Sequence, residues 1–238
     1  MGDPSVHYLE LTVDGCPSPY LKAGSGPPLV LLHGGASDSR DWLGVMAEMS
    51  PFYTCYAPDL PGFGRRDGRK SGYYLSEFID FIRGFIRELS LEAPVLVGHS
   101  LSGRLSLEIA RCYPEEVSKI VVVDSSGFGR ASRLGSSMIA VIWALRKLAM
   151  LPQPYPDFLL RDGEDPHFIY LDQLPAIAAP TFIVWKRYDL YFPLSQAVEA
   201  SRRLPRASLA VIPGYGHAPH KQDTSAFCRH LKAFLNRG

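Results

Sequence analysis

Two serines in the stretch VLVGHSLSG have a hydroxyl that could act as a nucleophile. The apolar residues up to Gly98 predict a strand, and the residues from Leu101 onward predict a helix. So tight a turn strains its central residue and requires small residues two positions before and two after it. Centring the turn on Ser100 puts Gly98 and Ser102 at these positions, whereas centring it on Ser102 puts the bulky Arg104 at one of them. Ser100 is therefore the candidate nucleophile.

A serine hydroxyl is a weak nucleophile at neutral pH, so it needs a general base and an acid that orients this base. Of the seven histidines, only His217 directly follows a strand pattern, in VIPGYGHAPH, and His220 is the alternative. For the acid, Asp189 follows the strand pattern in FIVWKRYD, and Asp124 in VVVDSSG is the alternative. We expect Ser100, His217 and Asp189 to form a catalytic triad, with His99 in a structural role.

Backbone amides can stabilise the oxyanion that forms when a serine attacks a carbonyl group. The first N–H groups of the helix after the nucleophile are unpaired, which makes Leu101 one donor. The loop after PLVLLHGG contains Gly34 and Gly35, where the backbone can approach a ligand closely. We expect the oxyanion hole to combine the amide of Leu101 with a free N–H of the loop that contains Gly34 and Gly35.

Extended and helical segments alternate along the chain, and several of the extended ones are apolar throughout. This pattern is typical of the α/β class, with a mostly parallel sheet that has helices on both faces. The predicted strands are HYLELTV, PLVLLHG, YTCYAPDL, APVLVGHS, VSKIVVVDSSG, APTFIVWKRYD and ASLAVIPGYGH.

Residues 128–177 interrupt this alternation with an apolar helix and the proline-rich LPQPYP. We expect them to form a small helical cap inserted after the sixth strand, between core residues 1–127 and 178–238. Insertions at the carboxyl ends of strands are where α/β sheets bind ligands, although an apolar helix can also be part of the core. The predicted substrate-binding side chains are those of Trp42, Met138, Ile142 and Trp143.

The composition excludes several other functions. With 46% hydrophobic residues, 21% charged residues and a net charge of +1, nothing favours nucleic acid or an anionic membrane as a partner. The apolar run MIAVIWAL is too short to span a membrane, and no secretory signal opens the chain, so we expect a cytoplasmic protein. Four scattered cysteines suggest free thiols and no metal site, and the oligomeric state stays open.

With these motifs assembled, the chain resembles the α/β-hydrolase superfamily over nearly its whole length. The matching segments, in the order of the family, are HGG, DLPGFG, GHSLSG, WKRYDLYFP and GYGH. The resemblance implies the α/β-hydrolase fold, the triad order Ser, Asp, His and no cofactor. It also implies that the backbone amides of Gly35 and Leu101 are the oxyanion donors. Ser102 and Lys186 stand where the family usually has glycine, and Lys186 leaves the path of the loop carrying Asp189 less certain.

The resemblance implies an esterase-like or lipase-like serine hydrolase with a short cap. Related dehalogenases and epoxide hydrolases have aspartate at the nucleophile position, so Ser100 argues against both. We expect hydrolysis of a small to medium apolar carboxylic ester. One alternative is carbon–carbon bond hydrolysis of a vinylogous keto acid, for which Arg104, Arg130 or Lys186 could bind the acid. Another is a ligand-binding receptor with slow or no turnover.

Overall fold

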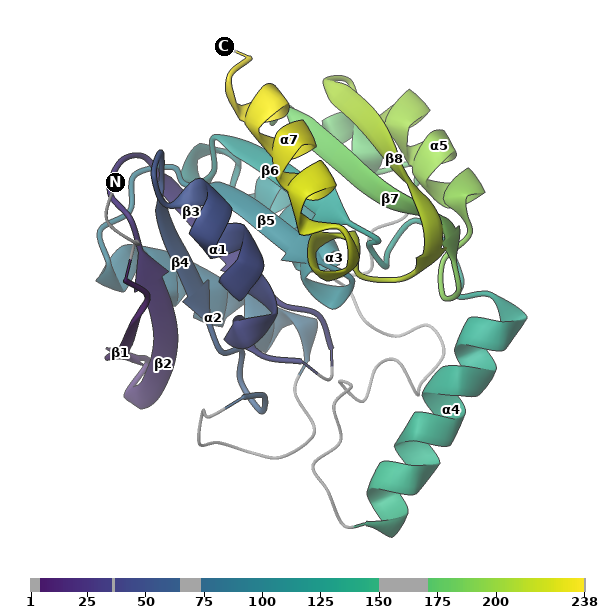
Figure 1. Ribbon diagram of the computed structural model, residues 1–238, viewed down its shortest axis with the longest axis horizontal. Helices are drawn as coiled ribbons and strands as arrows, with labels where there is room; N and C mark the ends of the chain where they lie inside the picture. The colour runs from purple at the N-terminus through teal and green to yellow at the C-terminus, as the bar shows by residue number, and fades with distance from the viewer. Residues whose placement is uncertain (1–4, 36, 65–73, 150–170, 238) are drawn as a thin grey trace.

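The computed structural model describes residues 5–35, 37–64, 74–149 and 171–237, and one sheet forms its centre (Figure 1). Its strands are β1 (His7–Val13), β2 (Cys16–Ala23), β3 (Pro28–Leu32), β4 (Thr54–Pro58), β5 (Val95–His99), β6 (Lys119–Val123), β7 (Thr181–Asp189) and β8 (Ala207–Gly216). They lie in the order β1-β2-β4-β3-β5-β6-β7-β8. β2 pairs antiparallel with β1 and β4, and the other pairs are parallel. The predicted mostly parallel sheet is confirmed.

The sequence pattern missed β2, because its segment CPSPYLKA contains two prolines. Both Pro17 and Pro19 lie in the half of β2 that pairs with β1 alone, and the pairing with β4 begins at Tyr20. A proline is tolerated where a strand has a free edge, since no neighbouring strand needs its missing N–H. The prolines therefore mark an edge of the sheet and do not prevent the strand.

Helices cover both faces of the sheet, as predicted. The described helices are α1 (Leu43–Met49), α2 (Leu75–Glu88), α3 (Leu101–Cys112), α4 (Arg133–Leu148), α5 (Leu194–Arg203), α6 (Pro219–Gln222) and α7 (Thr224–Leu235), with short 3-10 turns η1 (Ser39–Trp42), η2 (Pro114–Glu116) and η4 (Leu174–Ala176). Two hydrophobic clusters form the core. One joins α2, α3 and α5 to Leu96 of β5, and the other joins α1 and α7 to Val95 and Val97 of the same strand. Alternate residues of a buried strand point to opposite faces, so an uninterrupted apolar run fills both clusters.

α4 lies between β6 and β7 in the chain and projects away from the sheet (Figure 1). The residues that flank it in the predicted cap are not all peripheral: Phe128, Leu174 and Ile177 are buried in the cluster that includes α3. The division into a core and a cap at residues 128–177 stays a prediction. In the part of the chain that the structure describes, no helix has the length and apolarity needed to cross a membrane.

Candidate active site

Ser100 lies at a sharp turn between β5 and α3 and has the backbone angles φ 52° and ψ −111°. A positive φ is rare for any residue with a side chain. A Cβ atom at Gly98 would overlap the backbone of Ser102 and Gly103, so only glycine fits there. Ser102 takes the place of a glycine without strain, because its side chain is buried and its hydroxyl donates a hydrogen bond to the His33 carbonyl. The predicted elbow thus has the expected geometry around Ser100.

The side chains of Ser100, His217 and Asp189 form a continuous chain of hydrogen bonds. The Ser100 hydroxyl lies 2.9 Å from Nε2 of His217, and Nδ1 of His217 lies 2.8 Å from Oδ2 of Asp189. With Nδ1 as the donor to the carboxylate, Nε2 is free to accept the serine proton. The side chain of His217 is 17% exposed and that of Asp189 is fully buried. The base is therefore accessible to a substrate, while the acid is shielded from water.

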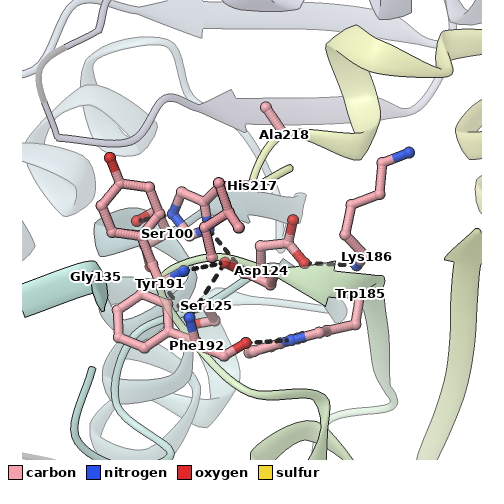
Figure 2. A network of polar contacts seen from close by, with 12 residues as sticks. Ser100, Asp124, Ser125, Gly135, Trp185, Lys186, Tyr191, Phe192, His217 and Ala218 are labelled. Atoms are coloured by element: carbon pink, nitrogen blue, oxygen red, sulfur yellow. Dashed lines mark hydrogen bonds and ion pairs between the residues drawn. The ribbon is translucent and has the colours of Figure 1, made fainter. Parts of the chain in front are cut away.

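The loop between β7 and α5 holds the Asp189 carboxylate in place. Its Oδ1 accepts hydrogen bonds from the backbone N–H groups of Tyr191 at 2.7 Å and Phe192 at 3.1 Å. The rings of these residues lie 4.6 Å and 5.6 Å from the His217 ring (Figure 2). Sequence reasoning missed Tyr191 and Phe192 as neighbours of the base. Their position in the sequence, shortly after Asp189, was the signal that could have identified them.

His99 has the structural role that was expected of it. Its Nε2–H donates a 2.6 Å hydrogen bond to the backbone carbonyl of His217, which follows two glycines of positive φ at Gly214 and Gly216. Burial, together with the nearby imidazoles of His220 and His217, keeps the pKa of His99 well below its ordinary value. His99 is therefore a neutral donor that ties the loop of the base to the end of β5.

The alternative base, His220, lies elsewhere. It is buried and stacks on Trp42 at a ring distance of 4.2 Å, and burial lowers its pKa to about 3. The structure therefore brings His217 and not His220 to Ser100. The same stack corrects the expectation that Trp42 contacts substrate: its side chain is 0% exposed, because it fills the core between α1 and α7.

The alternative acid, Asp124, directly follows β6, one strand away from Asp189. Its Oδ1 accepts a 2.8 Å hydrogen bond from the backbone N–H of Lys186. The ammonium group of Lys186 in turn donates to the Pro213 carbonyl at 2.9 Å. Lys186 thus fixes the end of β7 between β6 and β8, so its departure from the family pattern leaves the path to Asp189 intact.

The glycine loop after β3 lies directly against the nucleophile. A Cβ atom at Gly34 would come 2.7 Å from Nδ1 of His99 and 3.2 Å from Cβ of Ser100. His33, a residue that sequence reasoning did not assign, pins this loop: its Nδ1 donates to the Gly34 carbonyl at 2.8 Å, and its Nε2 accepts from the N–H of Leu60 at 3.0 Å. Burial lowers the pKa of His33, in keeping with this neutral tautomer. Half-buried Gly35 follows, and Leu101 begins α3.

The remaining predicted binding residues belong to α4. Met138 and Ile142 are half-buried and line an open hollow of about 330 Å³ together with Ser137 and Val141. The side chain of Trp143 lies outside the described residues. The structure does not bring the side chains of Met138 and Ile142 into hydrogen-bonding or ring contact with the triad within the described residues, so the binding role of α4 stays a prediction.

The fold, the elbow and the order of the strand-end residues define an α/β hydrolase, and comparison with known proteins agrees. The model of the Alpha/beta hydrolase family matches residues 29–229. The chain belongs to this family and is a hydrolase.

Two curated relatives and one solved structure illustrate its neighbours. The chain is 27% identical to pimeloyl-[acyl-carrier protein] methyl ester esterase of Vibrio campbellii, over 89% of this chain and 95% of that protein. It is 24% identical to 2-hydroxy-6-oxo-6-phenylhexa-2,4-dienoate hydrolase of Burkholderia cepacia, over 91% and 90% of the two chains. A carboxylesterase structure from Bacillus subtilis superposes with a TM-score of 0.84 at 19% identity, covering 98% of this chain and 93% of that one. This last likeness is one of fold alone.

Proposed function

We propose that the protein is a serine hydrolase that cleaves small to medium apolar carboxylic esters through an acyl-enzyme intermediate. The observation that supports this most directly is the chain of two short hydrogen bonds from Ser100 through His217 to Asp189. This is the arrangement in which an imidazole removes a serine proton while a buried carboxylate holds the ring in the required tautomer.

In the proposed mechanism, the Ser100 hydroxyl attacks the ester carbonyl as Nε2 of His217 takes its proton. Asp189 stabilises the imidazolium that forms, and His217 then gives the proton to the departing alcohol. Water, deprotonated by the same imidazole, attacks the acyl-enzyme and regenerates Ser100. No atom other than those of substrate, water and these side chains changes its bonding.

The amides of Gly35 and Leu101 are the proposed oxyanion donors. Gly34 supports this assignment, because its backbone lies against the Ser100 side chain with no room for a Cβ atom. Leu101 is the first residue of α3, where an N–H has no partner within the helix. Losing one such donor typically costs about 3 kcal/mol of transition-state stabilisation.

The apolar character of the proposed substrate rests on α4. Its hollow is lined by Met138, Val141 and Ile142, and these side chains offer no charge to a ligand. The relative from Vibrio campbellii, whose name specifies a methyl ester, also supports an ester as the scissile group.

Carbon–carbon bond hydrolysis of a vinylogous keto acid is the second candidate, because the Burkholderia cepacia relative is named as a hydrolase of such a compound. That substrate carries a carboxylate that a cation would bind. Of the cations considered, Lys186 is buried and donates to Pro213, and Arg130 is exposed. Arg104 is buried in α3, with its stem near Gly127. We therefore favour the ester.

Labelling with a fluorophosphonate tests the nucleophile. The wild-type protein should take up one equivalent and lose its activity on a short-chain aryl ester, whereas Ser100→Ala should neither be labelled nor cleave the ester. Ser102→Ala is the matched control, because it removes the neighbouring hydroxyl of the same turn and should still be labelled. If Ser100→Ala reacts and cleaves the ester at the wild-type rate, the proposed nucleophile is wrong.

A substrate panel separates the two reactions. Aryl esters of graded acyl length should show a maximum of kcat/KM at short to medium chains, and a meta-ring-fission product should be cleaved poorly. Faster turnover of the ring-fission product than of every ester would favour the second candidate.

A further inference from the structure

A second carboxyl group, that of Asp124, lies beside the proposed triad and has no part in the mechanism above. Asp124 directly follows β6 and Asp189 ends β7, and these strands are parallel neighbours. One carboxylate oxygen of each aspartate and one ring nitrogen of His217 all lie within 4.8 Å of one another. Figure 2 shows the Asp124 side chain next to the imidazole and below the loop that carries it.

Of the two carboxylate oxygens of Asp124, one has a hydrogen-bond partner in the described structure and the other has none. Oδ1 accepts the N–H of Lys186 at 2.8 Å and so helps to hold the end of β7. Oδ2 is buried and has no hydrogen-bond partner among the residues that the structure describes. An unpaired buried carboxylate oxygen is costly, so a purely structural role explains only half of this side chain.

The two acids have opposite surroundings. The Asp189 carboxyl group accepts hydrogen bonds from the N–H groups of Tyr191 and Phe192 and from Nδ1 of His217. Burial, and next the charge of Asp189, hold the pKa of Asp124 well above its ordinary value. Two carboxyl groups that share a site do not readily ionise together. These surroundings favour the protonated form of Asp124.

We propose that Asp124 is a reserve positioning acid, which orients His217 and stabilises its cation when Asp189 cannot. This inference rests on the proposed function of Ser100, His217 and Asp189. Distance and charge support this role: the Oδ2 atom that lacks a partner belongs to a carboxyl group that has an oxygen within 4.8 Å of both Asp189 and His217.

Removing the charge at position 189 removes the second of the two causes that raise the pKa of Asp124, while burial, the larger cause, remains. Once ionised, Asp124 supplies the negative charge beside His217, and its proton passes to solvent. When His217 takes the proton of Ser100, the imidazolium faces this carboxylate instead of Asp189. An ionised Asp124 likewise favours the tautomer with the proton on Nδ1, which leaves Nε2 free to act as the base.

Asparagine substitutions at both sites, alone and combined, test the proposal with little disturbance of the fold. In Asp189→Asn, the side-chain oxygen can still accept the N–H groups of Tyr191 and Phe192. In Asp124→Asn, it can still accept the N–H of Lys186, and asparagine tolerates the positive φ of 42° at this position. The measurements are kcat/KM for a short-chain aryl ester and the rate of fluorophosphonate labelling, both across pH.

We expect Asp124→Asn alone to change kcat/KM by less than about threefold. Loss of the orienting acid in a serine protease costs about 10⁴-fold in kcat. Asp189→Asn should here lose only about 10²-fold, and the double variant should lose the remaining factor of about 10². The kcat/KM that remains in Asp189→Asn should increase with pH as the carboxyl group of Asp124 ionises. The double variant lacks this group, so its pH profile should lack this increase.

Glu108→Gln is the matched control. Glu108 is also a buried carboxylate, but it lies on α3 and pairs with Arg111 of the same helix. It should have the same small effect in the wild type and in Asp189→Asn. If Asp189→Asn alone loses about 10⁴-fold and Asp124→Asn adds nothing to it, Asp124 is not a reserve acid.

Infrared difference spectra give a readout that does not depend on turnover. The wild-type protein at neutral pH should show the carbonyl band of a protonated carboxylic acid that Asp124→Asn lacks, and its absence would overturn the proposal. Failure of the triad itself looks different: Ser100→Ala would then be labelled and active, whatever the aspartate variants do.

Discussion

Contacts with the rest of the molecule fix the carboxyl ends of β5, β7 and β8 more firmly than they fix the helix α4. At the strand ends, Ser100, Asp189 and His217 are joined to one another. Backbone N–H groups of Tyr191 and Phe192 hold Asp189, and the side chain of His99 holds the backbone carbonyl of His217. On α4, Leu145 is 60% exposed and Leu148 is 83% exposed, although both are apolar.

The difference shows how fold and function are divided between the two regions. Parallel strands end at one edge of the sheet, so residues far apart in sequence meet there with little freedom. α4 is attached near its start, where Ser132 donates through its hydroxyl to Leu190 and through its N–H to Tyr191. The proposed triad thus lies on the edge of the sheet, and the helix that carries the proposed substrate-binding residues is joined to the loop that follows Asp189.

The largest effect is expected from Gly98→Ala at the elbow. The added methyl group would overlap the carbonyl of Ser102, and backbone cannot move aside as a side chain can. We expect a loss of about 3 kcal/mol or more in the free energy of unfolding, together with loss of ester hydrolysis. Urea denaturation and activity assays measure both.

Gly15→Ala is the control for this substitution. Gly15 has a positive φ of 77° and no atom within 4 Å of an added Cβ, so only the backbone conformation opposes the change. It should cost about 1 kcal/mol and leave activity intact. If Gly98→Ala and Gly15→Ala lower the free energy of unfolding equally, overlap with the backbone of Ser102 is not the reason why position 98 requires glycine.

A smaller effect is expected from the pH dependence of stability, which tests whether the core beneath the site depends on neutral imidazoles. The pKa of buried His220 is about 3 when folded, below its value of about 6.5 when unfolded. The unfolded chain therefore binds more protons between these values, and stability falls as pH falls from 6.5 toward 3. One such imidazole lowers the free energy of unfolding by at most about 1.4 kcal/mol for each pH unit of this fall.

His220→Phe should flatten this decline in chemical denaturation curves at pH 7, 6, 5 and 4, because a phenyl ring keeps the stack on Trp42 without titrating. His230→Phe is the control, since His230 is exposed on α7 and should leave the slope unchanged. If the free energy of unfolding of His220→Phe declines with falling pH as steeply as that of the wild type, His220 is not a cause of the acid sensitivity.

Ser132→Ala tests the attachment of α4 and should have an effect of about 1 kcal/mol. The Ser132 hydroxyl accepts the N–H of Gly135 as the helix cap and donates to Leu190. Amide hydrogen exchange in α4 should accelerate about fivefold, while exchange in β5 stays unchanged. Ser137→Ala is the control, because the exposed Ser137 hydroxyl bonds only to Arg133 within the described chain. Equal acceleration in both variants would mean that Ser132 does not anchor the helix.

The sequence was enough to propose which residues meet, because elementary constraints act on them. The size of residues 98 and 102 favoured Ser100, and positions at strand ends favoured Asp189 and His217 over Asp124 and His220; the structure joins these three side chains by hydrogen bonds. The geometry of a parallel sheet and the resemblance to a known family carried these proposals.

Other features depend on contacts that sequence patterns do not encode. Trp42 looked like a pocket residue because it follows the oxyanion loop, yet its side chain turns into the core against His220. β2 was hidden by Pro17 and Pro19, whose tolerance depends on which strand lies beside them. The position of the apolar helix relative to the sheet likewise depends on tertiary packing and not on its own periodicity.

The smallest effect is expected on α4 itself, from Leu145→Gln. A side chain that is 60% exposed contributes little burial, so the free energy of unfolding should change by less than about 0.5 kcal/mol. Leu105→Ala on α3 is the contrast, because Leu105 is fully buried and its truncation should cost about 2–5 kcal/mol. If α4 forms part of the substrate surface, Leu145→Gln should still raise KM for the longer acyl esters of the panel while leaving kcat for the shortest one unchanged. A stability loss as large as that of Leu105→Ala would show that Leu145 is covered in solution, and the contrast between a rigid edge and a loosely attached helix would then be wrong.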